Sequence, residues 1–217
     1  MSDERLRELE RRWKETGAVE DEAAFLLERV RAGDLTREKL ETAAHYCEHE
    51  AACLALGLPM PQHNVEVDAW LVALRDRQEG LALRAGIALA RLVLPIWEEP
   101  YPDDPRPRLA LQASEAVLAG SGRGELAGRA ADHANDAAVE TERRAGGASS
   151  AAACLSALAD YASGAYGELL TVPECAREAL GSDWDPTAVR SALRAELALW
   201  VLGRSGGEDL THQAAPG

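Results

Sequence analysis

Four residues that could bind a metal ion lie close together in the segment AAHYCEHEAACLALG: His45, Cys47, His49 and Cys53. His45, His49 and Cys53 are spaced i, i+4 and i+8, so a straight helix would place them along one face. Histidines four residues apart on a helix are known zinc ligands, and a cysteine thiolate can be a third. The outer pair would lie about 12 Å apart along the helix axis, however, so one helix rarely brings all three to one ion. We therefore favour ordinary, partly buried side chains and expect no cofactor. A metal-binding protein or metal-dependent enzyme using these three residues is the alternative.

A second set of polar residues, Asp132, Asp136 and Glu140, forms an acidic stripe with the same spacing. Helical Mg²⁺-dependent enzymes such as terpene synthases use acidic helix motifs of this kind. Their second motif needs an asparagine followed at four-residue intervals by Ser or Thr and then Glu, and the residues after Asn135 do not supply it. A solvated helix face is the favoured interpretation of the stripe.

The sequence contains none of the local patterns that position a nucleophile or a phosphate group. There is no GxSxG motif and no Gly-rich phosphate loop; Gly120, Gly122 and Gly124 read as a flexible break between helices. We therefore expect that the protein is not an enzyme.

The charge balance limits the kinds of partner. The net charge is −14 at pH 7, and such a field repels a phosphate backbone, so we expect no nucleic-acid binding. The N-terminal segment is charged throughout and lacks the pattern of a signal peptide, which predicts a cytoplasmic protein. We expect the four cysteines of such a protein to be free thiols. The longest apolar stretch, 81–97, contains two arginines and reads as too short and too charged to span a membrane.

Helical periodicity extends over nearly the whole chain. Alanine and leucine dominate the apolar positions, aromatic residues make up 5%, and no alternating run predicts a strand. We expect an all-α protein, an irregular multi-helix bundle or degenerate α-solenoid of about ten helices without a sheet. It would form a single domain over residues 1–204, with an N-terminal group (1–57), a linker (58–64) and a central and C-terminal bundle (65–204). A disordered tail would follow at 205–217.

The strongest break in the helical pattern is the proline-rich segment EEPYPDDPRPR, which predicts a rigid loop between two helices. Exposed polar and aromatic side chains on such a loop are candidates for contact with a partner. We select a set from this loop and from the acidic stripe as candidate partner-binding residues: Tyr101, Asp103, Asp104, Arg106, Arg108, Asp132, Asp136 and Glu140.

The segment from about Arg84 to Ala162 resembles the Imm5-like immunity-protein domain. The resemblance rests on RAGIALARLVLPIWEEPYPDDPRPRLALQASEAVLAG, followed by the alanine-rich helices AADHANDAAVE and SSAAACLSALADYA. Pro105 to Arg108 fit the family's proline loop and His133 matches a helix histidine. The second helix departs from the pattern, because it carries Cys154, Ser156 and Asp160 where the family tends to have histidine. The N-terminal segment is similar to a set of helical proteins from GC-rich bacteria. The resemblance implies an all-helical domain of the immunity-protein type and supplies no catalytic residues.

These observations favour a non-enzymatic cytoplasmic module that binds another protein, as an immunity protein binds a toxin. Besides the metal-binding alternative at His45, His49 and Cys53, a structural scaffold or oligomerisation unit is the other hypothesis. The identity of the partner and the oligomeric state are left open by the sequence.

Overall fold

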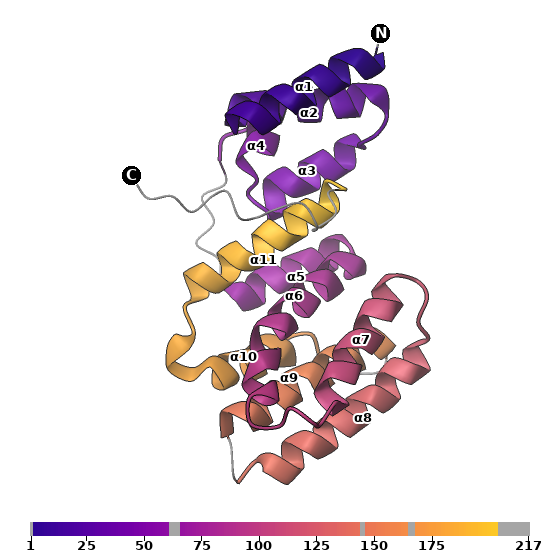
Figure 1. Ribbon diagram of the computed structural model, residues 1–217, viewed down its shortest axis with the longest axis vertical. Coiled ribbons are helices and arrows are strands. Elements are labelled where there is room, and N and C mark those ends of the chain that lie inside the picture. Colours follow the sequence, from indigo (N-terminus) through magenta and orange to yellow (C-terminus); the bar gives the residue numbers. More distant parts are fainter. Residues whose placement is uncertain (1, 61–65, 144–145, 165–167, 204–217) are drawn as a thin grey trace. The chain divides into compact units, whose positions relative to one another are not determined.

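The computed structural model describes residues 2–60, 66–143, 146–164 and 168–203 (Figure 1). Within these ranges the protein has eleven α-helices, one short 3-10 helix and no strand, which confirms the all-α fold class. The chain divides into two compact units: unit 1 is Met1–His63 with Arg194–Gly217, and unit 2 is Asn64–Leu193. The single domain expected over residues 1–204 stays a prediction. The expected tail at 205–217 and most of the expected linker lie outside the described residues.

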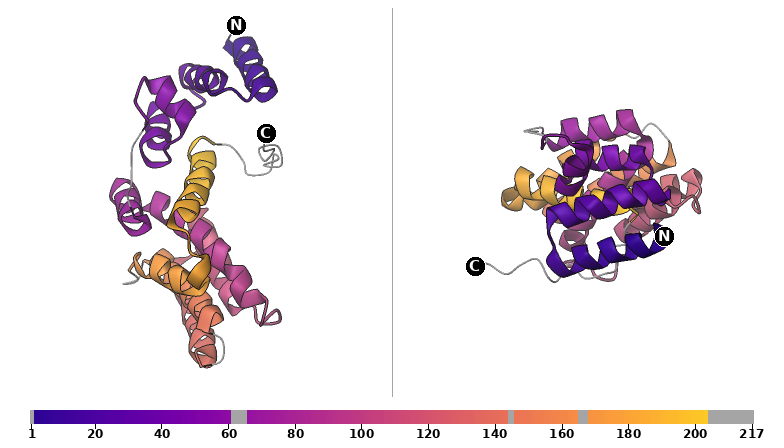
Figure 2. Two further views of the ribbon diagram at one scale, coloured as in Figure 1. Left: turned by 90° about the vertical axis from the view of Figure 1, so that its left-hand side faces the viewer. Right: turned by 90° about the horizontal axis from the view of Figure 1, so that it is seen from above.

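Unit 1 contains four helices and the C-terminal part of a fifth: α1 (Ser2–Thr16), α2 (Val19–Ala32), α3 (Arg37–Tyr46), α4 (Glu50–Leu56) and α11 (Pro186–Val201). α1 packs against α2, and α4 packs against both α2 and α3. The view from above in Figure 2 shows α1 and α2 side by side. Residues with strong capping preferences lie at the helix ends. Thr36 accepts a hydrogen bond from the backbone N–H of Lys39 (3.2 Å), and α2 and α4 end at Gly33 and Gly57, which both have positive φ.

Unit 2 contains the remaining helices and the start of α11: α5 (Val67–Arg77), α6 (Glu79–Glu98), α7 (Arg106–Leu118), α8 (Gly124–Thr141), α9 (Gly146–Ser163), α10 (Thr171–Leu180) and the 3-10 helix η1 (Gly181–Asp183). α9 is the central helix of the unit, because it packs against α6, α7, α8 and α10.

Small residues form much of the packing around α9. The buried residues that α8 and α9 contribute are mostly alanines: Ala127, Ala131, Ala134 and Ala138 on α8, and Ala148, Ala151, Ala152 and Ala159 on α9. Side chains this small allow neighbouring helix axes to approach closely. α6 approaches closely at Gly86, where an added Cβ would lie 2.9 Å from the Cδ1 of Leu158 on α9.

α6 is buried around most of its circumference, as its apolar composition predicts. By length and composition alone its segment Gly80–Glu98 is long and apolar enough to cross a membrane, contrary to our expectation from the sequence. The core helix of a globular unit can have the same length and apolar composition. In this protein, 61% of the most apolar 18-residue part of the segment is buried inside the protein. The helix also continues through Pro95 to Glu98, so this proline does not end it.

Candidate functional site

The loop between α6 and α7 is anchored by a buried tryptophan near the end of α6. Trp97 is fully buried, and its indole N–H donates a hydrogen bond to the backbone carbonyl of Asp104 (3.1 Å). The Tyr101 ring contacts the Trp97 ring in a tilted arrangement with centroids 4.6 Å apart, and its backbone N–H donates to the carbonyl of Trp97 (3.1 Å). The proline-rich segment therefore forms an ordered turn over the end of α6, as its composition predicts.

Asp104 and Arg106 connect this loop to the start of α7. The Asp104 carboxylate accepts a hydrogen bond from the backbone N–H of Arg106 (3.1 Å), which has no partner within the first turn of the helix. The same carboxylate also pairs with the Arg106 side chain, at 3.0 Å from Oδ1 to Nε and 2.7 Å from Oδ2 to Nη2. Two parallel contacts fix the plane of the guanidinium group as well as its position.

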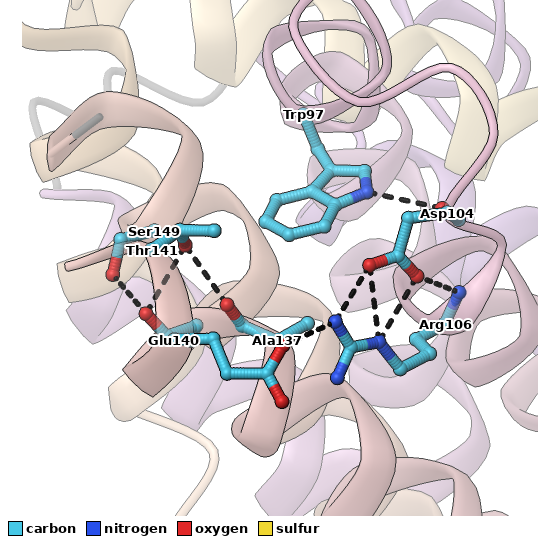
Figure 3. Close-up of polar contacts among 8 residues, drawn as sticks. Trp97, Asp104, Arg106, Ala137, Glu140, Thr141 and Ser149 are labelled. Carbon is cyan, nitrogen blue, oxygen red and sulfur yellow. Dashed lines mark hydrogen bonds and ion pairs between the residues drawn. The ribbon is translucent and has the colours of Figure 1, made fainter. Parts of the chain in front are cut away.

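Arg106 also reaches across to α8. Its Nη2 lies 2.8 Å from Oε2 of Glu140, so one guanidinium group joins the α6–α7 loop to the last turn of α8 (Figure 3). We call Trp97, Asp104, Arg106 and Glu140 the loop brace. It fixes together four elements that are adjacent in the chain: α6, the loop, α7 and α8.

Two hydroxyl groups extend these polar contacts to α9 (Figure 3). The Thr141 Oγ1 donates to the carbonyl of Ala137 (2.8 Å), and the Ser149 Oγ at the start of α9 donates to the carbonyl of Ala138 (2.9 Å). Both hydroxyl groups are buried, so these hydrogen bonds satisfy groups that would otherwise be costly to bury. One end of the α6–α9 region is thus held by polar contacts between every pair of consecutive helices.

The ion pairs of the loop brace shift the pKa values of their members. Hydrogen bonding to Arg106 is the main cause that lowers the pKa of Asp104 and also that of Glu140. The same contacts raise the pKa of Arg106, with Asp104 the larger cause and Glu140 the smaller. All three groups are therefore charged at neutral pH. A carboxylate held in this way is a poor general acid, because its pKa lies far from the operating pH.

The structure divides the other candidate partner-binding residues into paired and exposed groups. Arg108 pairs with Glu98, with 2.7 Å between its Nε and Oε1. Asp103 is exposed at the tip of the loop, and Asp132 and Asp136 are exposed on α8. The acidic stripe is therefore not one uniform site, because Glu140 turns toward α7 and the other two carboxylates remain in solvent.

The histidines and cysteines of the segment 45–53 do not lie along one face of a single straight helix. α3 ends at Tyr46 and α4 begins at Glu50, with Glu48 between them at a φ of 51°. His45 is exposed, whereas His49 lies with its Nε2 3.4 Å from Oε1 of Glu22. Cys53 is buried, and its thiol donates to the carbonyl of Ala44 (3.5 Å). In the described part of the chain, no three His, Cys, Asp or Glu side chains gather in a group that could hold a metal ion.

Unit 1 contains a largely buried ion pair that the sequence alone does not indicate. Arg194 of α11 pairs through Nη1 with Oε2 of Glu48, and 146 residues separate the two in sequence. Only 10% of the Arg194 side chain and 17% of the Glu48 side chain are exposed. No local pattern indicates this pair, because each residue reads alone as an ordinary charged position on a helical segment.

Comparison with known families matches residues 74–166 to the family described as Imm-5 like putative immunity protein. The match runs from the last turn of α5 to the end of α9, lies entirely within unit 2, and includes the whole loop brace. It confirms the resemblance that the sequence indicates between about Arg84 and Ala162. No curated protein and no solved structure matches the chain.

Proposed function

We propose that this protein is a non-enzymatic binding module of the immunity type, which binds and neutralises a toxin protein in the cytoplasm. The observation that carries the proposal is the family match over residues 74–166, which coincides with the braced helices α6–α9. A protein that blocks a toxin needs a rigid surface, because ordering flexible groups on binding costs free energy. The loop brace and the buried hydroxyl contacts supply that rigidity at one end of these helices.

The electrostatics of the loop brace favour a binding role over a catalytic one. Asp104 and Glu140 form ion pairs with Arg106, and the lowered pKa values of the two carboxyl groups keep them ionised. Charged groups that are paired with one another in this way are suited to holding a loop in place. General acid–base catalysis instead needs a group that exchanges a proton near pH 7.

The direct test sequences the reading frames on either side of this protein's gene and co-expresses any toxin domain that they encode with this protein. We expect the toxin alone to arrest growth of the host cells, and the toxin together with this protein to allow growth. Purified protein should also form a stable complex with a catalytically inactive variant of that toxin, detected by isothermal titration calorimetry. Absence of both protection and binding would contradict the proposal.

A titration of the active toxin separates binding from enzymatic detoxification. A binding module must be present in about equimolar amount, so residual toxin activity should fall linearly and reach its minimum near one equivalent. An enzyme that destroys the toxin or its product would act at a small fraction of an equivalent, with an effect that grows with time. Protection at a hundredth of an equivalent would therefore contradict a non-enzymatic role.

A further inference from the structure

Four large hydrophobic side chains of the described residues are about half exposed or more, and three of them lie on α7 and α8. The three are Val139 (65% exposed), Leu109 (51%) and Leu126 (49%), and the fourth is Leu54 (48%) on α4. A single exposed apolar residue is ordinary on a protein surface, whereas several on neighbouring elements are typical of a contact surface. This concentration lies within the region that matches the immunity family.

Helix geometry places Val139 beside the exposed carboxylates of α8. With about 100° between successive residues, Asp132, Asp136 and Val139 fall within about 60° of one another around the helix axis. The opposite side of α8 is buried, with Ala127, Ala131, Ala134 and Ala138 at the core of unit 2. An apolar side chain and two carboxylates therefore share the outward face of α8.

Leu109 of α7 is exposed at the same end of this helix pair as Val139. α7 and α8 run antiparallel, because Arg106 at the start of α7 pairs with Glu140 at the end of α8 and only residues 119–123 join the other ends. Leu109 is one turn along α7 from Arg106, and Asp136 is one turn back along α8 from Glu140. Both therefore lie at the end of the α7–α8 pair where Arg106 contacts Glu140.

The charge of this face is negative and is not neutralised within the protein. The exposed charged residues of α8 are Glu125, Arg129, Asp132, Asp136 and Glu140, of which only Arg129 is basic. Glu140 shares its charge with Arg106, whereas Asp132 and Asp136 form no ion pair among the described residues. The whole chain carries a net charge of −14, so the long-range field also attracts a cationic partner.

We propose that Leu109, Asp132, Asp136 and Val139 form a docking surface for a basic face of the partner protein, one that presents Lys or Arg side chains around an apolar contact. This inference rests on the proposed function and identifies the surface and the partner chemistry that would perform it. The loop brace borders the docking surface and fixes the end of α8. Apolar contacts would supply the affinity, and the two free carboxylates would steer and orient the partner.

The test measures binding of the toxin against which this protein protects in the co-expression experiment, as a catalytically inactive variant, to wild-type protein and to two charge-reversal variants. D132K/D136K reverses the docking surface, and E4K/E8K makes the same change of charge, at the same i, i+4 spacing, on exposed positions of α1. We expect D132K/D136K to weaken binding about tenfold or more at low salt, mainly through a slower association rate, and E4K/E8K to change it less than about twofold. The loss should shrink at 0.5 M salt, because exposed charges are screened there.

A third variant tests the apolar part, and thermal unfolding checks that each variant folds. L109S/V139S should weaken binding about tenfold at every salt concentration, since the apolar contact is not screened. If the wild-type protein binds the toxin but D132K/D136K binds as well as E4K/E8K, the docking surface is wrong while the immunity function stands. If the wild-type protein neither binds nor protects, the proposed function is wrong, and the docking surface with it.

Discussion

Arg106 and Glu140 are 34 residues apart in sequence, and their side chains meet with 2.8 Å between Nη2 and Oε2. The contact joins the start of α7 to the end of α8, and Asp104 contacts the same Nη2 and the Nε of that guanidinium group. One arginine thus connects the proline-rich loop, which Trp97 anchors to α6, with the end of α8. The consequences of removing it distinguish a structural brace from a partner-binding residue.

Replacing Arg106 with Leu should destabilise the protein without abolishing its fold. The change removes charge-assisted hydrogen bonds to Asp104 and Glu140, in a position where 28% of the arginine side chain is exposed. We expect a loss of about 1–2 kcal/mol in the free energy of unfolding. E140Q should cost less, because the Glu140 side chain is 61% exposed and Asp104 still pairs with Arg106. Urea denaturation of the three proteins checks this order, and an equal loss in both variants would contradict it.

The ion pairs of the loop brace should make the free energy of unfolding depend on pH in the acid range. The pKa values of Asp104 and Glu140 are lowered from ordinary values of 3.8 and 4.5 in the folded protein, so the unfolded chain takes up protons first as the pH falls. Their contribution is complete above about pH 4.5 and is lost as the pH falls through the lowered pKa values. In urea denaturation, the stability difference between wild type and D104N should be larger at pH 7 than at pH 3. A difference that does not change with pH would contradict this assignment.

The sequence predicts the elements of the fold much better than the contacts between them. The helix ends at Thr36, Gly33 and Gly57 follow from local chemistry, because a threonine caps the start of α3 and glycines with positive φ follow the ends of α2 and α4. The proline-rich loop can also be predicted from its local sequence. The pairing of Arg106 with Glu140 cannot be predicted in this way, because it depends on how two helices pack. Helical spacing alone groups Glu140 with the exposed carboxylates of α8. Positions 132 and 140 are rotated by about 80° around the helix axis, which is enough to direct Glu140 toward α7.

The break between α3 and α4 is a second feature that the local sequence does not predict. The segment HYCEH contains neither Gly nor Pro, so local signals do not specify a sharp turn there. Glu48 nevertheless adopts a positive φ, which is unfavourable for a residue with a side chain. Its partner is Arg194, far along the chain, and that tertiary contact compensates a backbone conformation that the local sequence does not favour.

Breaking the Glu48–Arg194 pair should be among the most destabilising single changes in unit 1. E48Q removes the negative charge that faces the buried Arg194, and R194M removes the positive charge that faces Glu48. We expect each to cost about 3 kcal/mol, and the double variant E48Q/R194M to cost clearly less than the sum, because no unbalanced charge remains. Chemical denaturation of the four proteins gives the coupling energy. Additive losses would show that the pair contributes no specific interaction.

The four thiols should differ in their reactivity toward a thiol-specific reagent at pH 8. Cys47, Cys53 and Cys154 are buried, and burial raises the pKa of Cys47 to about 12, an effect only partly offset by Arg194. Cys175 is half-buried, and burial followed by Glu178 and Glu174 raises its pKa as well. We expect one thiol to react first, more slowly than a free cysteine, and three to react only after unfolding. C175S should remove the first reaction, whereas rapid labelling of two or more thiols would contradict the burial of the others.

Two glycines of α8 that face the same residue should respond in opposite ways to alanine. A Cβ at Gly124 would lie 2.5 Å from the backbone oxygen of Ser163 at the end of α9, whereas a Cβ at Gly128 would make ordinary contacts of 3.6 and 3.8 Å with the Ser163 side chain. A backbone atom cannot move aside as a flexible side chain can, so G124A should destabilise the protein by about 1–3 kcal/mol. G128A should stabilise it by up to about 1 kcal/mol, because alanine is the better helix former. Thermal unfolding should therefore move the two midpoints in opposite directions, and a G124A protein as stable as wild type would show that α8 and α9 do not meet this closely at Gly124.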